Sequence, residues 1–151
     1  GVRVSIFMQG CAFNCKNCFN PETHDFNGGK EFTDDTINRV MELCENENVE
    51  GLSILGGEPM HPKNIEGTTK LAKTFKEKFP NKNLWAWTGF QFDKDLKDKE
   101  VLKYIDVLVD GQYADELHNP TLSWRGSENQ RVIDVQKSLK NGEVTVWEDA
   151  S

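Results

Sequence analysis

The chain has 151 residues, and its 25 acidic and 18 basic side chains give a net charge of -7 at pH 7. This length suits one domain with its own core, and the acidic balance argues against a protein that binds nucleic-acid phosphates through clustered Lys and Arg. No apolar run approaches the ~18 residues that a membrane span requires. The clustered spacing of the cysteines does not resemble the disulfide framework of a secreted protein, so we expect a cytoplasmic protein.

A strand, an irregular loop and a helix are predicted for the first part of the chain. Residues 2–8 alternate Val, Val, Ile and Met with other side chains, which predicts a strand. Residues 20–29 are rich in turn formers and predict irregular structure. A helix is expected from Thr33 or Asp34, because apolar side chains then recur on one helical face. These side chains are Ile37, Val40, Met41 and Cys44.

Strands and helices continue to alternate along the rest of the chain. The sequence predicts strands at 52–55, 84–87 and 107–109, and helices at 62–79 and 93–104. The expected inner side chains of these helices are Ile65, Leu71, Ala72, Phe75 and Phe79, then Leu96, Val101 and Leu102. A polar stretch up to Gln130 is too long for a simple connection in a compact domain. Residues 131–135 and 144–147 predict short strands or extended segments.

The alternation predicts an α/β fold with right-handed crossovers and a mainly parallel sheet. Ligands of such folds bind beyond the carboxyl ends of the strands. Four short motifs fall there, each directly after a predicted strand. They are the cysteine loop 11–18, Gly-Gly-Glu-Pro at 56–59, Thr-Gly-Phe at 88–90 and Asp-Gly-Gln-Tyr at 110–113. A closed eight-stranded barrel takes ~250 residues, so an open partial barrel fits this length better.

Three of the four cysteines form the loop Cys11-Ala-Phe-Asn-Cys15-Lys-Asn-Cys18. Three thiolates can hold a four-iron cluster and leave one iron open to another ligand. The alternatives are a closed zinc site, with His24 as the fourth ligand, and free thiols. The fourth cysteine, Cys44, is interpreted as a buried apolar residue of its helix face rather than as another metal ligand.

The motif Gly56-Gly57-Glu58-Pro59 suits a ligand with an ammonium group. Two glycines let a ligand approach the backbone closely, and Glu58 places a negative charge beside their carbonyl groups. The alternative is a tight turn between a strand and a helix. The sequence shows no convincing Cys/His or Ser/His/Asp constellation for acid–base catalysis. His24, His61 and His118 are interpreted as polar loop residues.

The cysteine loop followed by Gly-Gly-Glu-Pro resembles the radical S-adenosylmethionine superfamily. Further motifs resemble the activating enzymes of anaerobic (class III) ribonucleoside-triphosphate reductases. These motifs are Cys18-Phe-Asn-Pro-Glu-Thr-His-Asp-Phe-Asn-Gly-Gly29, Trp87-Thr-Gly-Phe90, Val107-Leu-Val-Asp-Gly111 and Arg125-Gly-Ser-Glu-Asn-Gln-Arg131. The resemblance extends from Val2 to Trp147 and implies one domain over residues 1–151, an open partial (βα) barrel of the radical S-adenosylmethionine type.

The chain departs from this family in two ways. Asn17 stands before the third cysteine, where many radical enzymes have an aromatic residue. Family members usually carry an additional segment before the first strand, so we expect that a short N-terminal segment is lacking here, which leaves the edge of the first strand uncovered.

The resemblance implies that Cys11, Cys15 and Cys18 bind a [4Fe-4S] cluster, whose fourth iron is chelated by S-adenosylmethionine. An electron from a reduced donor such as flavodoxin cleaves this cofactor. The resulting 5′-deoxyadenosyl radical then abstracts hydrogen from a glycine near the C-terminus of the partner reductase. The alternatives are an activator of another glycyl-radical enzyme and, from a different class, a small Cys3His zinc-binding interaction module.

The family's cofactor contacts carry over to six positions of this chain. The methionyl ammonium group is expected at Gly56, Gly57 and Glu58, and the nucleotide beside Asn17 and Cys18. Asp110 is expected as a partner for the ribose or the methionyl group. In the polar stretch after it, Trp124, Arg125 and Arg131 are the residues expected to dock the reductase.

Overall fold

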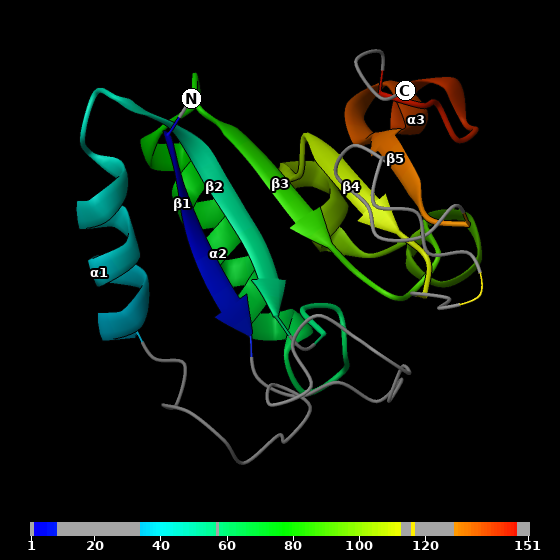
Figure 1. Cartoon of the computed structure of the whole chain (residues 1–151), viewed down its shortest axis with the longest axis horizontal. Helices are drawn as coiled ribbons and strands as arrows, with labels where there is room; N and C mark the ends of the chain where they lie inside the picture. Colours follow the sequence, from blue (N-terminus) through cyan, green and yellow to red (C-terminus); the bar gives the residue numbers. More distant parts are fainter. Residues whose placement is uncertain (1, 9–33, 57, 113–115, 117–128, 148–151) are drawn as a thin grey trace.

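The computed structural model describes residues 2–8, 34–56, 58–112, 116 and 129–147. Its centre is a five-stranded sheet in the order β1-β2-β3-β4-β5 (Figure 1). The strands are β1 (Val2–Met8), β2 (Val49–Gly56), β3 (Asn83–Trp87), β4 (Val107–Asp110) and β5 (Arg131–Asp134). The first four are parallel, and β5 pairs with β4 in the antiparallel direction. The expectation of an α/β fold with a mainly parallel sheet is therefore confirmed.

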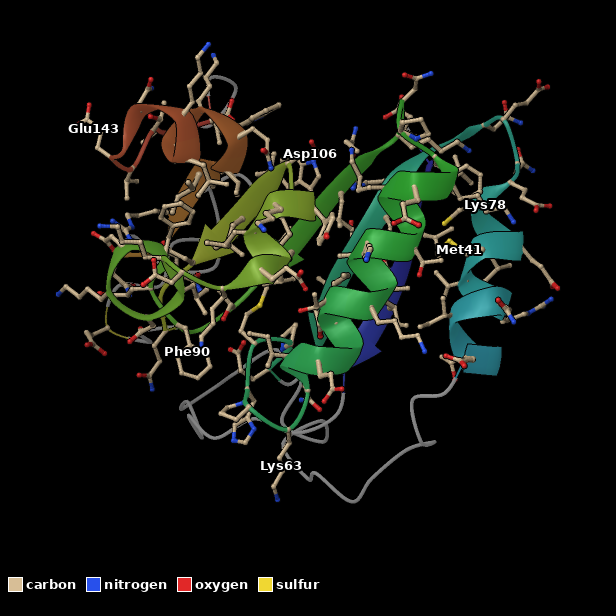
Figure 2. All side chains as sticks on the ribbon, turned by 180° about the vertical axis from the view of Figure 1, so that it is seen from behind. Met41, Lys63, Lys78, Phe90, Asp106 and Glu143 are labelled. Atoms are coloured by element: carbon tan, nitrogen blue, oxygen red, sulfur yellow. The ribbon has the colours of Figure 1, made fainter. Side chains whose placement is uncertain are left out.

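Two amphipathic helices cover one face of this sheet. Figure 2 shows α1 (Asp34–Cys44) and α2 (Ile65–Lys78) side by side across the strands. Their apolar side chains form the main core with the strand residues that face them. These strand residues are Leu52, Ile54, Leu84, Ala86, Leu108 and Ile133. Each fully buried Leu, Ile or Phe side chain contributes about 1.5–3 kcal/mol, so this layer supplies most of the stabilisation.

The alternate strand residues form a second, smaller apolar cluster on the opposite face of the sheet. Trp85, Val107, Val109 and Val132 are buried there, with Trp87 and Trp147 packed against them. Arg3 ties the edge strand β1 to this face: its Nε donates to the Ser53 hydroxyl at 2.9 Å, and its guanidinium lies over the Trp85 ring. The first strand is thus anchored on the side opposite the helices.

The predicted helices agree with the structure in part. The helix at 34–44 is confirmed, and its predicted inner face is buried, including Cys44. The helix predicted from Pro62 begins at Ile65, because the carbonyl of His61 accepts hydrogen bonds from the N–H groups of both Asn64 and Ile65 and closes a turn before it.

The single helix predicted at 93–104 is wrong. The segment forms a short π-helical turn, η2 (Phe92–Leu96), and a 3₁₀ helix, η3 (Glu100–Tyr104), separated by an extended Lys99. Leu96 and Leu102 are both buried, as predicted. On a continuous helix these two positions would be rotated by about 120° from each other, so the break lets both reach the core.

The C-terminal part contains one helix that the sequence analysis missed. Helix α3 (Val135–Asn141) follows β5 directly, so the strand predicted to Val135 ends at Asp134. The Asp134 carboxylate accepts a hydrogen bond from the Lys137 N–H at 3.1 Å and caps the helix. Of the segment 144–147, Val146 forms an isolated bridge with Ile133. In the described ranges, no helix is long and apolar enough to cross a bilayer.

Candidate functional site at the carboxyl edge of the sheet

The carboxyl ends of the four parallel strands meet at one edge, which we call the carboxyl edge. The register pairs Met8, the last residue of β1, with Gly56, the last residue of β2. Neighbouring strands lie about 4.8 Å apart, so Met8, which precedes the cysteine loop in the sequence, lies directly beside the first residue of the Gly-Gly-Glu-Pro motif. Figure 2 places Lys63 and Phe90, which follow β2 and β3, at one end of the molecule, and Asp106, before β4, toward the other. The predicted convergence of the motifs after β2, β3 and β4 is confirmed.

Several predicted site residues lie outside the described residues. They are Cys11, Cys15, Asn17, Cys18 and Gly57, together with the alternative ligand His24 and the docking candidates Trp124 and Arg125. Their assignments stay predictions. Glu58, Asp110 and Arg131 have described side chains, and the site is built from these.

Glu58 is a buried carboxylate with 1% of its surface exposed. Its Oε1 accepts a hydrogen bond from the Gly89 N–H at 2.6 Å. Its Oε2 accepts two, from the Thr88 hydroxyl at 2.6 Å and from the Met60 N–H at 2.9 Å. Burial raises the pKa of the Glu58 carboxyl, and these three donors oppose that shift. The carboxylate is therefore held in place by the ends of two strands, β2 and β3.

The turn that carries Glu58 is fixed to the first part of α2. The Asn64 side chain donates to the Glu58 carbonyl at 2.9 Å, and the Thr68 hydroxyl donates to the Pro59 carbonyl at 2.8 Å. Thr68 is buried, and so is Met60. The backbone around Glu58 is thus supported by a helix rather than by the turn alone.

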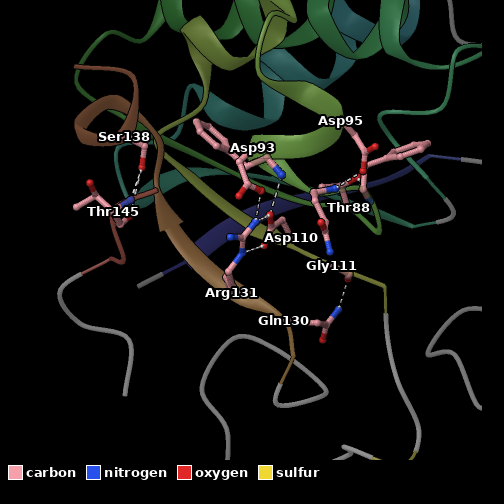
Figure 3. A network of polar contacts seen from close by, with 12 residues as sticks. Thr88, Asp93, Asp95, Asp110, Gly111, Gln130, Arg131, Ser138 and Thr145 are labelled. Atoms are coloured by element: carbon pink, nitrogen blue, oxygen red, sulfur yellow. Dashed lines mark hydrogen bonds and ion pairs between the residues drawn. The ribbon is translucent and has the colours of Figure 1, made fainter. Parts of the chain in front are cut away.

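Asp110 is the second buried carboxylate at this edge, and it is bound by an arginine. Arg131 donates from Nε to Oδ1 at 2.9 Å and from Nη2 to Oδ2 at 2.6 Å (Figure 3). The Phe92 N–H also donates to Oδ2, at 2.8 Å, and Asp93 accepts a further hydrogen bond from Arg131 Nη2. The hydrogen bonds that Arg131 donates to Asp110 raise the pKa of Arg131 above its ordinary value. This network joins β4, β5 and η2.

The backbone after Asp110 turns sharply at Gly111, whose φ of 99° lies in the left-handed region that favours glycine. The Gly111 N–H donates to the Phe90 carbonyl at 3.0 Å, and the Gln130 side chain donates to the Gly111 carbonyl at 3.0 Å. The residues after β3 and β4 are therefore connected to each other and to the start of β5.

The two buried carboxylates differ in their counter-charge. Asp110 has no exposed surface and is neutralised by Arg131. Among the described residues, no Lys, Arg or His forms an ion pair with Glu58. A buried carboxylate is costly unless a cation or several hydrogen bonds compensate it. The arrangement at Glu58 suits a ligand that brings a positive charge, whereas Asp110 already has its cation.

Sequence reasoning identified Glu58 and Asp110 but missed the groups that bind them. Thr88 and Gly89 were recognised only as a motif at a strand end, and their bonds to Glu58 connect residues about thirty positions apart in the chain. Arg131 was assigned to docking, whereas its guanidinium contacts Asp110 and Asp93. One signal could have indicated the ion pair. Asp110 ends one predicted strand and Arg131 begins another, and the register pairs these two residues.

The core interpretation of Cys44 is confirmed. Its side chain is fully buried in the main core, and burial raises the pKa of its thiol. Cys44 ends α1 before β2 begins, which places it toward the amino ends of the strands, away from the carboxyl edge. His61 accepts a hydrogen bond from the Lys63 N–H at 3.0 Å, as a polar turn residue does. Within the described ranges, no three His, Cys, Asp or Glu side chains gather as a metal site.

Comparison with known proteins defines the class first. A family model described as a 4Fe-4S single cluster domain matches residues 1–133, which is most of the chain and includes the three-cysteine loop. The chain is therefore a member of this class of iron–sulfur domains.

The curated relatives are more specific. The anaerobic ribonucleoside-triphosphate reductase-activating protein of Enterobacteria phage T4 is 39% identical over 132 residues, 87% of this chain and 83% of the phage protein. Proteins of the same name from Haemophilus influenzae and Escherichia coli K12 are 36% and 35% identical over 135 residues, 87% of this chain and 87% and 88% of theirs. The chain belongs to the family of anaerobic ribonucleoside-triphosphate reductase-activating proteins.

Proposed function

We propose that this protein activates an anaerobic ribonucleoside-triphosphate reductase by reductive cleavage of S-adenosylmethionine at a [4Fe-4S] cluster. Cys11, Cys15 and Cys18 would bind the cluster. The name shared by the relatives supports the reductase as the partner, and the matching family model supports the cluster. The parallel strands β1–β4 would form part of an open partial barrel with the cofactors at its carboxyl edge.

The observation that carries the proposal is the buried Glu58 carboxylate. S-adenosylmethionine has an ammonium group, and no described residue supplies a cation to Glu58. Gly56 ends β2 opposite the last residue of β1, so an ammonium group bound at Gly56, Gly57 and Glu58 would lie beside the start of the cysteine loop. The position and burial of Glu58 thus support an amino-acid-like ligand bound next to a cluster on that loop.

The remaining proposed contacts are those with the nucleotide, with the ribose or methionyl group, and with the reductase. Asn17 and Cys18 would lie beside the nucleotide. Asp110 can contact the ribose or the methionyl group only by sharing a carboxylate that already accepts three hydrogen bonds, from Arg131 and the Phe92 N–H. Trp124, Arg125 and Arg131 stay docking candidates. The Arg131 side chain is 34% exposed, and its exposed part would contact the reductase.

The chemistry divides between the cofactors and the chain. A reduced cluster bound by Cys11, Cys15 and Cys18 would supply the electron for reductive cleavage of S-adenosylmethionine, and this cleavage would provide the radical chemistry that acts on a glycine of the reductase. The chain's own residues would bind and orient these groups: the three thiolates would hold the iron, and Glu58 would hold the ammonium group. Ile54 and Ala86, near the carboxyl ends of β2 and β3, are fully buried beneath the helices, so the sheet is closely packed next to the carboxyl edge.

The test is cofactor content and turnover. Anaerobically reconstituted protein is expected to hold about four irons per chain and, with a reductant, to convert S-adenosylmethionine into methionine and 5′-deoxyadenosine in equal amounts. A colourless protein that holds one zinc and takes up no iron would instead support the zinc-binding module. If the protein cleaves S-adenosylmethionine but activates only another glycyl-radical enzyme, its partner is that enzyme and not the reductase.

A further inference from the structure

The two residues that follow β3 act directly on the Glu58 carboxylate. Thr88 donates through its hydroxyl to Oε2, and Gly89 donates through its N–H to Oε1, both at 2.6 Å. Thr88 itself is fixed to the sheet, because its N–H donates to the Val109 carbonyl at 2.9 Å. The position of the carboxylate is therefore set by β3 and β4 as well as by its own turn.

The direction of the Thr88 hydroxyl is determined by its second partner. The Phe90 N–H donates to the Thr88 hydroxyl oxygen at 3.1 Å. Because a hydroxyl has one proton, and this oxygen already accepts from Phe90, the proton is free to be donated to Glu58. Thr88 is buried, so water does not readily replace this bond.

The hydrogen bonds leave the two oxygens of Glu58 unequal. Oε2 accepts two hydrogen bonds, from Thr88 and Met60, whereas Oε1 accepts one, from Gly89, counting the described residues. A carboxylate oxygen can accept about two hydrogen bonds. As far as the described residues go, Oε1 therefore keeps one acceptor position for a ligand.

We propose that Thr88 is a positioning residue that holds the Glu58 carboxylate so that Oε1 receives the ammonium group of S-adenosylmethionine. This inference rests on the proposed function. Thr88 would act through Glu58 and not by touching the reacting atoms. Its loss would weaken binding of ligands that carry the ammonium group and leave the rest of the cofactor's contacts intact.

The chain contains a matched control at Ser138 in α3. Its buried hydroxyl donates to the Asp134 carbonyl at 2.6 Å and accepts from the Thr145 N–H at 2.8 Å (Figure 3). Like the Thr88 hydroxyl, it donates to an oxygen and accepts from a backbone N–H, but its acceptor is a backbone carbonyl and not a carboxylate. Ser138 lies in α3, which follows β5, and the partners of its hydroxyl are Asp134 and Thr145, not Glu58. Ser138→Ala removes a comparable hydroxyl without changing the site.

The experiment measures ligand binding to the reconstituted, iron-loaded protein by equilibrium dialysis. Thr88→Val is expected to weaken S-adenosylmethionine binding about tenfold or more, the effect of losing one hydrogen bond to a charged group. Binding of 5′-methylthioadenosine, which lacks the amino-acid part, is expected to stay unchanged. Thr88→Ser restores the hydroxyl and is expected to restore binding, while Ser138→Ala binds like the wild type. If Thr88→Val does not keep its iron, Thr88→Ala, which adds no atom to the site, replaces it.

The outcomes separate the two proposals. If the wild type binds S-adenosylmethionine and both Thr88→Val and Thr88→Ala bind it equally well, the positioning role is wrong and the proposed function stands. If Thr88→Val weakens binding of S-adenosylmethionine and of 5′-methylthioadenosine equally, the positioning role is also wrong, because the pocket as a whole has changed. If the iron-loaded wild type binds no S-adenosylmethionine, the proposed function and this inference both fail.

Discussion

Replacing any one of Cys11, Cys15 or Cys18 by Ala is expected to abolish both stable iron binding and activation of the reductase. Three thiolates from one loop are the smallest set that holds a four-iron cluster with one open iron, and two cannot retain it. The expected iron content falls from about four per chain to near zero after anaerobic reconstitution and desalting. Iron analysis and the cluster's visible absorption measure this directly.

Cys44→Ala is the matched control for these three variants. Cys44 is fully buried in the main core, so its replacement is expected to keep the iron and to lower the free energy of unfolding by roughly 1–2 kcal/mol through lost packing. A Cys44→Ala protein that folds but holds no cluster would contradict its place in the core. A Cys15→Ala protein with full iron content would contradict the cysteine loop as the metal site.

Replacing Arg131 by Ala is expected to lower the free energy of unfolding by about 3 kcal/mol. The substitution leaves the Asp110 carboxylate without its cation, at a position with no exposed surface. Removing one partner of a buried pair typically costs about 3–5 kcal/mol, and the lower value is expected because Arg131 is itself 34% exposed. Urea unfolding followed by circular dichroism measures the change.

The control for this variant is Arg39→Ala. Arg39 pairs with Glu42 on the exposed side of α1, where the two side chains are 71% and 64% exposed. Such a pair contributes at most about 0.5 kcal/mol. Combining Arg131→Ala with Asp110→Asn is expected to recover part of the loss, because the buried charge is removed. If Arg131→Ala costs no more than Arg39→Ala, the network between β4, β5 and η2 does not stabilise the fold as described.

Local patterns were sufficient for the strands and for α1 because periodicity reports burial directly. The alternation in residues 2–8 and the helical spacing from Ile37 to Cys44 correspond to β1 and to the inner face of α1. The break at Lys99 was not predictable in this way, since the charged pattern on both sides of it suits a helix. Helix α3 was missed although Asp134 and Gly142, a capping residue and a left-handed glycine, mark its two ends.

The candidate site, too, was predictable only where a local motif marks the residue. The Gly-Gly-Glu-Pro motif identified Glu58, and the end of a strand identified Asp110. Their binding partners depend on tertiary contacts: Thr88 lies 30 residues from Glu58, and Arg131 lies 21 residues from Asp110. No short pattern in the sequence states that one carboxylate is paired with an arginine and the other is held by hydrogen bonds alone. That difference is what makes Glu58 the better ligand-binding candidate.

The protein is proposed to generate a glycyl radical on an anaerobic ribonucleoside-triphosphate reductase. Electron paramagnetic resonance of the reductase, after anaerobic incubation with this protein, S-adenosylmethionine and a reductant, tests it most directly. We predict a glycine-centred signal that requires all three additions and is absent with Cys15→Ala. A reductase that acquires no such signal, although the iron-loaded protein cleaves S-adenosylmethionine, would contradict the account.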